Sequence, residues 1–192
     1  MNIPAKYLKA ALLFASKKDV RYYLNGVLFE ALNGQARLVA TDGNMLGVFR
    51  LGECSLPDTQ IIIPRERLET IKLKADEVTL RPGDGKICAL VYSGDEFTFT
   101  AIDARFPDYR RVIPSGVMSG ESAQFSSELI VVLDKAYKVL NPSSKWNVPY
   151  ISHNGSRSGA LVDLNDDNFL GVIMPINQTA SGVRSLRTEA WI

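Results

Sequence analysis

Residues 22–51 read YYLNGVLFEALNGQARLVATDGNMLGVFRL and hold three strand-like runs separated by two turn dipeptides. The dipeptides are Asn33-Gly34 and Asp42-Gly43, which are typical of tight hairpins because Asn, Asp and Gly tolerate positive φ angles. The pattern therefore predicts an antiparallel meander with strands at Tyr22–Leu28, Ala36–Ala40 and Met45–Leu51.

A helical run precedes this meander and follows Ile3-Pro4. Its apolar residues recur at i, i+3, i+4 and i+7, which is the spacing of one helix face: Leu8, Ala11, Leu12 and Ala15. We expect the proline to occupy the first helical position, where its missing N–H costs nothing. The sequence thus predicts a lead strand, a helix and a meander in succession.

The same start recurs twice. Ile63-Pro64 lies 60 residues after Ile3-Pro4, and Leu68 follows it at the offset of Leu8. A third start, Phe125–Leu129, lacks the proline but has serine in the capping position. We expect the second helix to run from Arg65 to about Lys74. The further strands are expected at Glu77–Arg81, Ile87–Tyr92 and Phe97–Ile102, and at Val148–His153, Gly159–Leu164 and Asn168–Pro175. The prediction is an α+β fold of three repeated modules, each a lead strand, a helix and an antiparallel three-strand meander.

Composition and charge exclude several classes of protein. The 192 residues are 46% hydrophobic, and 22 Lys+Arg against 21 Asp+Glu leave a net charge of +1, so no overall excess indicates a polyanionic partner. Cys54 and Cys88 are isolated, which suits a reducing compartment rather than a disulfide scaffold. No signal-peptide or membrane-spanning pattern is visible, so we expect a soluble, cytoplasmic protein.

Residues that carry out catalysis are sparse. His153 is the single histidine and stands beside an Asn-Gly turn, without a second His or Cys at metal-ligand spacing. Asp95-Glu96 and Asp166-Asp167 lie in expected turns, where solvated turn chemistry accounts for them. We therefore expect no catalytic residue, no metal and no cofactor, and a protein that is not an enzyme.

The placement of the basic residues is more informative than their number. Residues 1–18 hold four lysines and no acid, and the second and third helices add further basic residues, while most acids fall in turns and strands. One basic side could attract DNA phosphates without regard to sequence. The alternative is that these lysines merely solvate exposed helix faces, and charge alone does not decide between the two. The basic candidates for DNA binding are Lys6, Lys9, Lys17, Lys18, Arg21, Arg67, Lys72, Lys74, Lys135 and Lys138.

Four segments resemble the bacterial sliding clamp family, the beta subunit of DNA polymerase III. The segments are Val20–Glu30, Ala40–Gly43, Arg105–Pro114 and Val172–Ile176, and they occur in the family's order at about its spacing. The resemblance implies a DNA-clamp fold, in which two such modules form one domain and domains close into a ring around duplex DNA. It also places Tyr22 and Tyr23 near the DNA, where an aromatic ring could stack on an unpaired base.

The resemblance further implies a hydrophobic pocket that binds short peptides of partner proteins. Without the resemblance, the apolar residues concerned would be interpreted as ordinary core. Carried over by position, the pocket residues are Leu24, Thr41, Gly43, Asn44, Met45, Leu46, Pro107, Arg111, Val112, Val172, Met174, Pro175 and Ile176. Asn44-Met45 stand where the family usually has His-Arg, so we expect a less cationic rim.

By this resemblance, residues 1–114 form one complete clamp-like domain, 115–122 a linker, 123–176 half a domain and 177–192 a C-terminal tail. The unpaired third module predicts self-association, and twelve modules in a tetramer would close a ring. The leading hypothesis is a processivity factor that encircles DNA near the nucleoid as a homo-oligomer and tethers a polymerase or other replication and repair proteins. The alternative is a non-encircling, truncated relative that binds clamp-partner peptides or the host clamp as a competitor.

Overall fold

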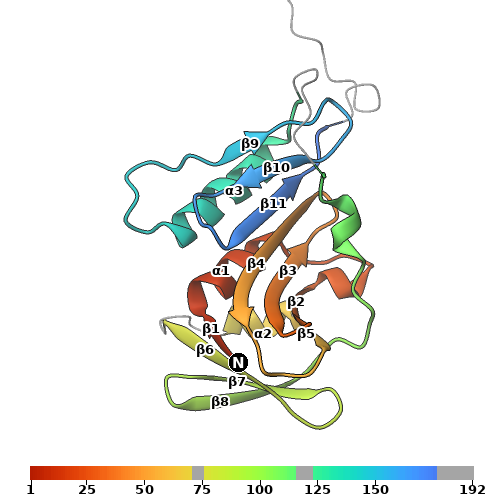
Figure 1. The fold of residues 1–192 in the computed structure, drawn as a ribbon, viewed down its shortest axis with the longest axis vertical. Helices are drawn as coiled ribbons and strands as arrows, with labels where there is room; N and C mark the ends of the chain where they lie inside the picture. Colours follow the sequence, from red (N-terminus) through yellow and green to blue (C-terminus); the bar gives the residue numbers. More distant parts are fainter. Residues whose placement is uncertain (71–75, 116–122, 177–192) are drawn as a thin grey trace, which may run out of the picture.

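The computed structural model describes residues 1–70, 76–115 and 123–176, and its helices and strands are labelled in chain order in Figure 1. The first module comprises β1 (Asn2–Pro4), α1 (Ala5–Phe14), the 3₁₀ turn η1 (Tyr22–Leu24), β2 (Gly26–Leu32), β3 (Gln35–Thr41) and β4 (Met45–Glu53). The second comprises β5 (Thr59–Pro64), α2 (Arg65–Thr70), β6 (Glu77–Pro82), β7 (Ile87–Tyr92) and β8 (Asp95–Thr100), and the 3₁₀ turn η2 (Tyr109–Val112) follows it. The third comprises α3 (Ser127–Leu140), β9 (Tyr150–Ser152), β10 (Ala160–Asp163) and β11 (Phe169–Ile173). The expected α+β class is confirmed.

The first two modules exchange their lead strands. β1 pairs with β6, with Pro4 opposite Glu77, and β5 pairs with β2, with Pro64 opposite Gly26. In both pairs the residue directly before a helix faces the first residue of the other module's meander. The exchange gives a four-stranded sheet in the order β1-β6-β7-β8 and ties the two modules together.

The third module extends the other sheet. Its order is β5-β2-β3-β4-β11-β10-β9, so β11 pairs antiparallel with β4 of the first module. Leu46-Gly47-Val48 and Leu170-Gly171-Val172 repeat the same three residues, and Gly47 lies directly opposite Gly171. An approximate two-fold axis through this glycine pair therefore relates β4 to β11, β3 to β10 and β2 to β9.

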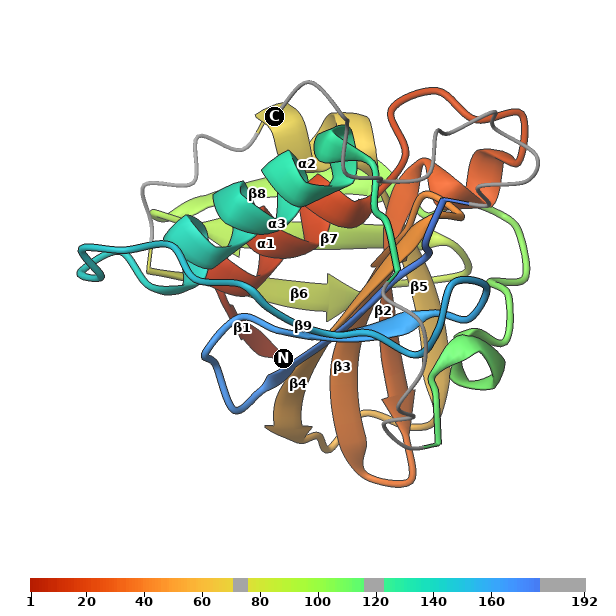
Figure 2. The ribbon, with the colours of Figure 1, turned by 90° about the horizontal axis from the view of Figure 1, so that it is seen from above.

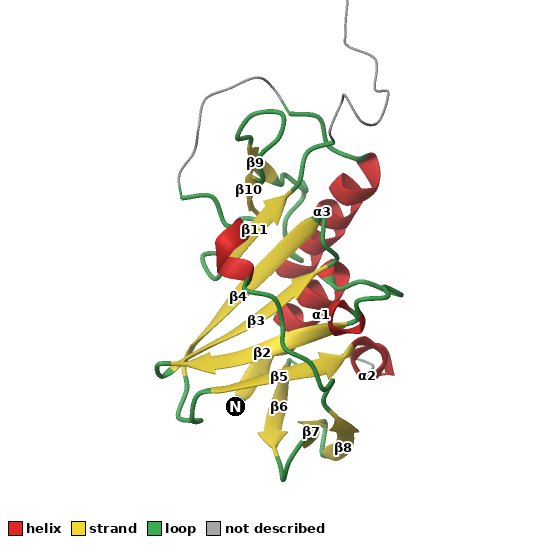
Figure 3. Cartoon of the chain, turned by 90° about the vertical axis from the view of Figure 1, so that its right-hand side faces the viewer, coloured by secondary structure: helices red, strands yellow, loops and turns green. Residues whose placement is uncertain are grey.

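The three α-helices lie on the same side of the seven-stranded sheet, whereas the 3₁₀ turn η2 packs on the other face (Figures 2 and 3). α1 and α3 lie side by side and contact one another, and α2 contacts α1. Arg65 of α2 fastens the end of α1, because its Nη1 donates to the carbonyl oxygens of Leu12 and Ala15 at 2.7 and 2.8 Å.

A cluster of three phenylalanines joins the first and third modules. Phe49 and Phe169 lie opposite each other across β4 and β11 with ring centroids 5.2 Å apart, and Phe14 of α1 packs on both. A Cβ atom on Gly47 would lie only 2.9 Å from the Phe14 ring, so the absence of a side chain there admits the ring.

Several local expectations differ from the structure. Tyr22–Leu24 form a turn in place of a strand, and β2 begins at Gly26, because the N–H groups of Leu24 and Asn25 bond back to Arg21 and Tyr22. Pro4 and Pro64 end edge strands instead of opening helices; the missing N–H is tolerated on an edge strand.

Two further expectations concern the module boundaries. The lead strand expected before the third helix is absent from the described residues, because 123–126 are irregular and no described strand pairs with them. The second helix is described to Thr70, and its expected end at Lys74 lies outside the described residues.

Candidate partner-binding pocket and helix face

A pocket of about 340 Å³ lies beside the junction of β4 and β11. Four segments line it: residues 21–24, the β3–β4 turn, residues 107–112 and residues 172–174. Leu24, Leu46 and Val172 are buried at its floor, whereas Val112 and Met174 are exposed at its rim. An apolar hollow with an exposed apolar rim is suited to the apolar side chains of a short peptide.

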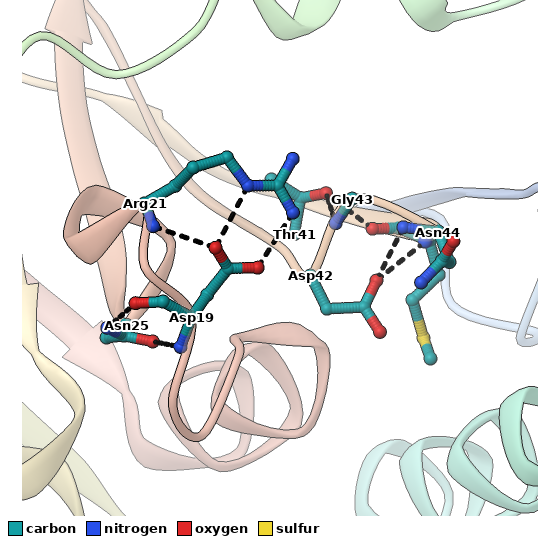
Figure 4. A network of polar contacts seen from close by, with 8 residues as sticks. Asp19, Arg21, Asn25, Thr41, Asp42, Gly43 and Asn44 are labelled. Carbon is teal, nitrogen blue, oxygen red and sulfur yellow. Dashed lines mark hydrogen bonds and ion pairs between the residues drawn. The ribbon is translucent and has the colours of Figure 1, made fainter.

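The β3–β4 turn is fixed by its own side chains (Figure 4). Thr41 Oγ1 accepts from the Gly43 N–H at 3.0 Å and donates to the Met45 carbonyl at 2.7 Å. Asp42 Oδ1 accepts from the N–H groups of Asn44 and Met45 at 2.8 and 2.9 Å. Gly43 adopts a φ of 95°, which a residue with a side chain would rarely reach. The turn is therefore preorganised before any ligand arrives.

Arg21 lies against this turn (Figure 4). Its Nε and Nη2 donate to the two carboxylate oxygens of Asp19 at 3.0 and 2.7 Å, and a Cβ on Gly43 would stand 2.9 Å from Nη2. The hydrogen bonds from Arg21, side chain first and backbone second, lower the pKa of Asp19 to about 2. Asn25 exchanges two hydrogen bonds with the backbone of Asp19. The pocket rim thus carries a guanidinium whose charge is already paired.

A buried carboxylate anchors the opposite wall. Glu30 of β2 is 2% exposed and accepts hydrogen bonds from Tyr109, Arg110 and Gln60. Burial opposes the ionisation of Glu30, but these hydrogen bonds outweigh it and hold its pKa below the ordinary value. Burial, with the bond to Glu30, raises the pKa of Tyr109 to about 12. The residues of η2 are therefore pinned to the sheet by a charged anchor.

The structure brings most of the expected pocket residues together. Ten line the cavity: Leu24, Thr41, Gly43, Asn44, Met45, Leu46, Pro107, Val112, Val172 and Met174. Arg111, Pro175 and Ile176 do not line it; the first is exposed on η2, and the N–H of the last donates to the Gln124 carbonyl at 2.7 Å.

Sequence reasoning missed four lining residues and the anchor behind them. Arg21 and Tyr23 were expected near DNA, yet both line the pocket, as do Asp108 and Tyr109. All four stand inside the segments that carried the family resemblance, so neighbourhood in sequence could have pointed to them. Glu30, an acid within an apolar strand, was a visible but unused sign of a buried polar anchor.

The expected DNA-contacting residues fall on the helices and on the loop after α1. Lys17, Lys18 and Tyr22 line an open groove of about 890 Å³ together with Arg65 and Glu69 of α2. Lys135 and Lys138 are exposed on α3, Arg67 is exposed on α2, and Lys9 is half-buried on α1. Lys72 and Lys74 lie outside the described residues.

Lys6 differs from the other lysines. Its Nζ forms an ion pair with Asp166 Oδ2 at 2.8 Å, and Tyr7 also donates to that carboxylate at 3.2 Å. Burial opposes the ionisation of Asp166, but hydrogen bonds from Lys6 and the Asn168 N–H keep its pKa below the ordinary value. Lys6 therefore links α1 to the β10–β11 turn.

The helix face also carries acids. Glu66 and Glu69 are exposed on α2, and Glu128 and Asp134 are exposed on α3. Glu69 pairs with Arg65 at 2.7 Å. The face is thus mixed in charge, and its exposed lysines among the described residues include Lys17, Lys18, Lys135 and Lys138.

Neither a metal cluster nor a membrane-spanning helix is present among the described residues. Within residues 1–70, 76–115 and 123–176, no three His, Cys, Asp or Glu side chains are grouped so as to hold a metal ion. Across the same ranges, no helix is long and apolar enough to cross a membrane.

Paired modules with helices on one face of shared sheets define the class of DNA-clamp folds, and solved clamps match this arrangement. The DNA polymerase III subunit beta of Pseudomonas aeruginosa superposes with a TM-score of 0.71 and 21% identity, over 92% of this chain and 65% of that one. A sliding clamp of Bartonella birtlesii bound to griselimycin gives a TM-score of 0.71 at 22% identity, over the same shares. The expected clamp fold is confirmed.

The chain belongs to the DNA polymerase III beta subunit family, because the family's central domain matches residues 3–108. The beta sliding clamp of Salmonella typhimurium is 45% identical over 102 residues, which are 50% of this chain and 28% of that protein. That of Escherichia coli is 40% identical over 115 residues, 57% of this chain and 31% of the relative. The chain therefore spans less than a third of the length of these curated relatives.

Proposed function

We propose that this protein is a processivity factor that encircles duplex DNA as a homo-oligomer and tethers a polymerase or other replication and repair proteins through the pocket beside β4 and β11. The observation that carries the proposal is the pocket itself. It is apolar, preorganised by the Thr41–Met45 turn and the Glu30 anchor, and lined by ten of the residues expected from the family. Tethering needs no bond making, so the proposed role is not enzymatic.

The helix face supports the DNA part of the proposal. Lys17 and Lys18 are exposed beside α2, and Lys135 and Lys138 are exposed on α3. Both helices lie on one side of the seven-stranded sheet (Figure 3). Such groups hold phosphates through counterion release without reading bases, which permits movement along the duplex. We place the DNA against α1, α2 and α3, and the partner peptide on the far side of the β4–β11 junction.

The domain assignment follows the same logic. In the proposal, residues 1–114 act as a complete clamp-like domain because their two modules exchange lead strands. Residues 123–176 act as half a domain joined to it through β11. A ring would then need several copies, and the cytoplasm near the nucleoid is where such a ring would act.

Binding of a labelled peptide tests the pocket. The probe is a short peptide with Leu and Phe anchors, followed by fluorescence anisotropy. Val112→Asp should weaken binding at least about tenfold, or ~1.4 kcal/mol, because it places a charge on the apolar rim. Val20→Asp is the matched control, since Val20 is exposed and lies outside the pocket. Equal binding by both variants would contradict the pocket assignment.

Retention on circular DNA tests encirclement. The protein is assembled with nicked circular DNA, washed at high salt to screen phosphate contacts, and then treated with an enzyme that linearises the circle. A ring should stay on the circle through the wash and leave after cutting. Loss during the wash would contradict encirclement.

A competitor of the host clamp is the second candidate, and one observation favours it. The pocket is complete within a single chain, so peptide capture requires neither a ring nor DNA. Peptide binding of normal strength combined with loss from circular DNA at high salt would identify this role.

A further inference from the structure

The outer edge of β9 is the feature that the proposed function leaves unexplained. Among the described residues β9 ends the seven-stranded sheet, and exposed apolar residues lie on it or within four residues before it: Trp146, Val148 and Tyr150 are 77%, 63% and 69% exposed. Ile130 and Val131 of α3 are exposed as well. A sheet edge flanked by apolar side chains readily pairs with another strand.

The opposite end of the same sheet indicates what such an edge accepts. There β5, a lead strand directly before a helix, covers the edge of β2. The approximate two-fold axis through Gly47 and Gly171 relates β2 to β9. The position beside β9 is therefore equivalent to the position that β5 occupies, and a lead strand is the element that fits it.

Residues 123–126 hold the place of a lead strand in the third module. The Ile176 N–H donates to the Gln124 carbonyl at 2.7 Å, just as the Ile102 N–H donates to the Ile62 carbonyl of β5 at 3.0 Å. Gln124 and Ile62 each lie three residues before the first residue of a helix. β5 uses its other edge to pair with β2, whereas within the described ranges no strand pairs with residues 123–126.

We propose that two copies of this chain associate through their third modules, with residues 123–126 of each copy added as a strand beside β9 of the other. The inference rests on the self-association contained in the proposed function and adds its surface and register. The lead strands β1 and β5 already pair within the chain, so neither can cover β9. Among the described residues, the segment that stands directly before a helix and pairs with no strand is 123–126. A second copy of the chain can supply this segment to β9, and it is therefore the partner that we infer. The exchange repeats between two chains what the first two modules do within one chain.

The register follows from the two exchanges inside the chain. Pro4 faces Glu77 and Pro64 faces Gly26, so the residue before a helix lies opposite the first residue of the partner's meander. Applied to the third module, Ser126 lies opposite Tyr150 of the second copy. One and two residues away, Phe125 faces Ile151 and Gln124 faces Ser152. The contact is reciprocal, as a two-fold dimer requires.

The apolar surface beside β9 is buried by the same contact. Trp146 and Val148 precede the strand, and Ile130 and Val131 lie on the helix that would meet its symmetry mate as α1 meets α2. All four side chains are uncharged, so no isolated charge is buried when the copies meet.

Sedimentation of the full chain tests the surface. The wild-type protein should form dimers or larger assemblies at micromolar concentration, and Val148→Asp should raise the dissociation constant at least about tenfold by placing a charge in the contact. Val20→Asp is the control, because Val20 is 97% exposed and lies far from β9 in sequence and outside its sheet. A wild-type monomer, or equal effects of both substitutions, would overturn the inference.

Cross-linking two single-cysteine proteins tests the register. Gln124→Cys and Ser152→Cys are prepared separately in a Cys54→Ser background, which leaves Cys88 buried. Directly opposed residues on antiparallel strands have Cα atoms about 4.5–5.5 Å apart, within the range of a disulfide. Mild oxidation of the mixture should give a covalent dimer, whereas each protein alone should give none.

The outcomes separate this inference from the proposed function. Absence of the mixed disulfide overturns the register, and a dimer formed equally by either protein alone places the contact elsewhere and also overturns it. Neither measurement involves DNA or peptide, so a failure here leaves the peptide and circular-DNA tests to be judged independently.

Discussion

The pocket and the helix face hold their functional side chains in opposite ways. Around the pocket, Thr41 and Asp42 each make two hydrogen bonds that fix the β3–β4 turn. Glu30 accepts hydrogen bonds from the side chains of Tyr109, which lines the pocket, and of Gln60. On the helix face, Lys17, Lys18 and Lys138 stand exposed on flexible stems. The difference indicates two kinds of recognition: the pocket selects by shape, and the helix face attracts charge without demanding a geometry.

Of the substitutions that test this difference, Phe169→Ala should have the largest effect on stability and on peptide binding. It removes a ring packed against Phe14 and Phe49 at the joint between the first and third modules. We expect a loss of about 3–4 kcal/mol in the free energy of unfolding and a loss of peptide binding, since β11 carries one pocket wall. Chemical denaturation and anisotropy measure both. Leu170→Ala, at the exposed next position, should cost less than about 1 kcal/mol; equal losses would refute the role of the joint.

Glu30→Gln should have the next largest effect. It keeps the shape but removes the charge that receives hydrogen bonds from Arg110 and Tyr109, at a cost of about 2 kcal/mol. The pKa of Glu30 is depressed in the folded protein, so its contribution is complete above the unfolded value near 4.3 and is lost as the pH falls through the lower folded value.

The difference in unfolding free energy between wild type and Glu30→Gln should therefore be constant from about pH 7 to 5 and narrow below about pH 4. Denaturation titrations at stepped pH measure it. A difference that widened on acidification would contradict the anchor.

Lys17→Ala combined with Lys18→Ala should affect DNA rather than stability. Loss of two phosphate contacts should weaken binding to duplex DNA about tenfold at low salt and reduce the slope of log affinity against log salt by about 2. Anisotropy with a labelled duplex over a salt series measures both, and peptide binding should be unchanged. An unchanged salt slope would mean that these lysines only solvate the surface.

Lys6→Met should have the smallest effect, and this effect should be on stability instead of DNA binding. Lys6 pairs with Asp166, so we expect a loss of about 0.5–1 kcal/mol in stability and little change in DNA affinity. Lys138→Met is the matched control and should show the reverse pattern, because Lys138 is exposed on α3. If Lys6→Met weakened DNA binding as much as Lys138→Met, its role as a link between modules would be wrong.

Much of the fold could be predicted from local patterns. Asn33-Gly34 and Asp42-Gly43 placed two turns correctly, and helix spacing located α1 and α3, because these depend on residues close in sequence. The pairing of β4 with β11 could not be predicted from spacing, since it joins distant segments. The resemblance of Val172–Ile176 to the clamp pocket strand nevertheless brought Val172 and Met174 into the pocket set.

The site was predicted less completely than the fold. Apolar lining residues were named by resemblance, but Glu30, Arg37 and Gln60 meet behind the pocket only after β2, β3 and β5 pair. Likewise the sequence around Lys6 does not predict its ion pair with Asp166, because the two residues are 160 positions apart. Polar networks that cross modules require the tertiary structure.

The β4–β11 ladder has a consequence for the order of events during synthesis. It pairs Met45 with Ile173, so β4 emerges from the ribosome long before its neighbour exists. Until then its unpaired edge is open to wrong strands, and closure of so long a loop is slow. The nascent chain therefore has a period of vulnerability to aggregation that ends only when β11 is translated.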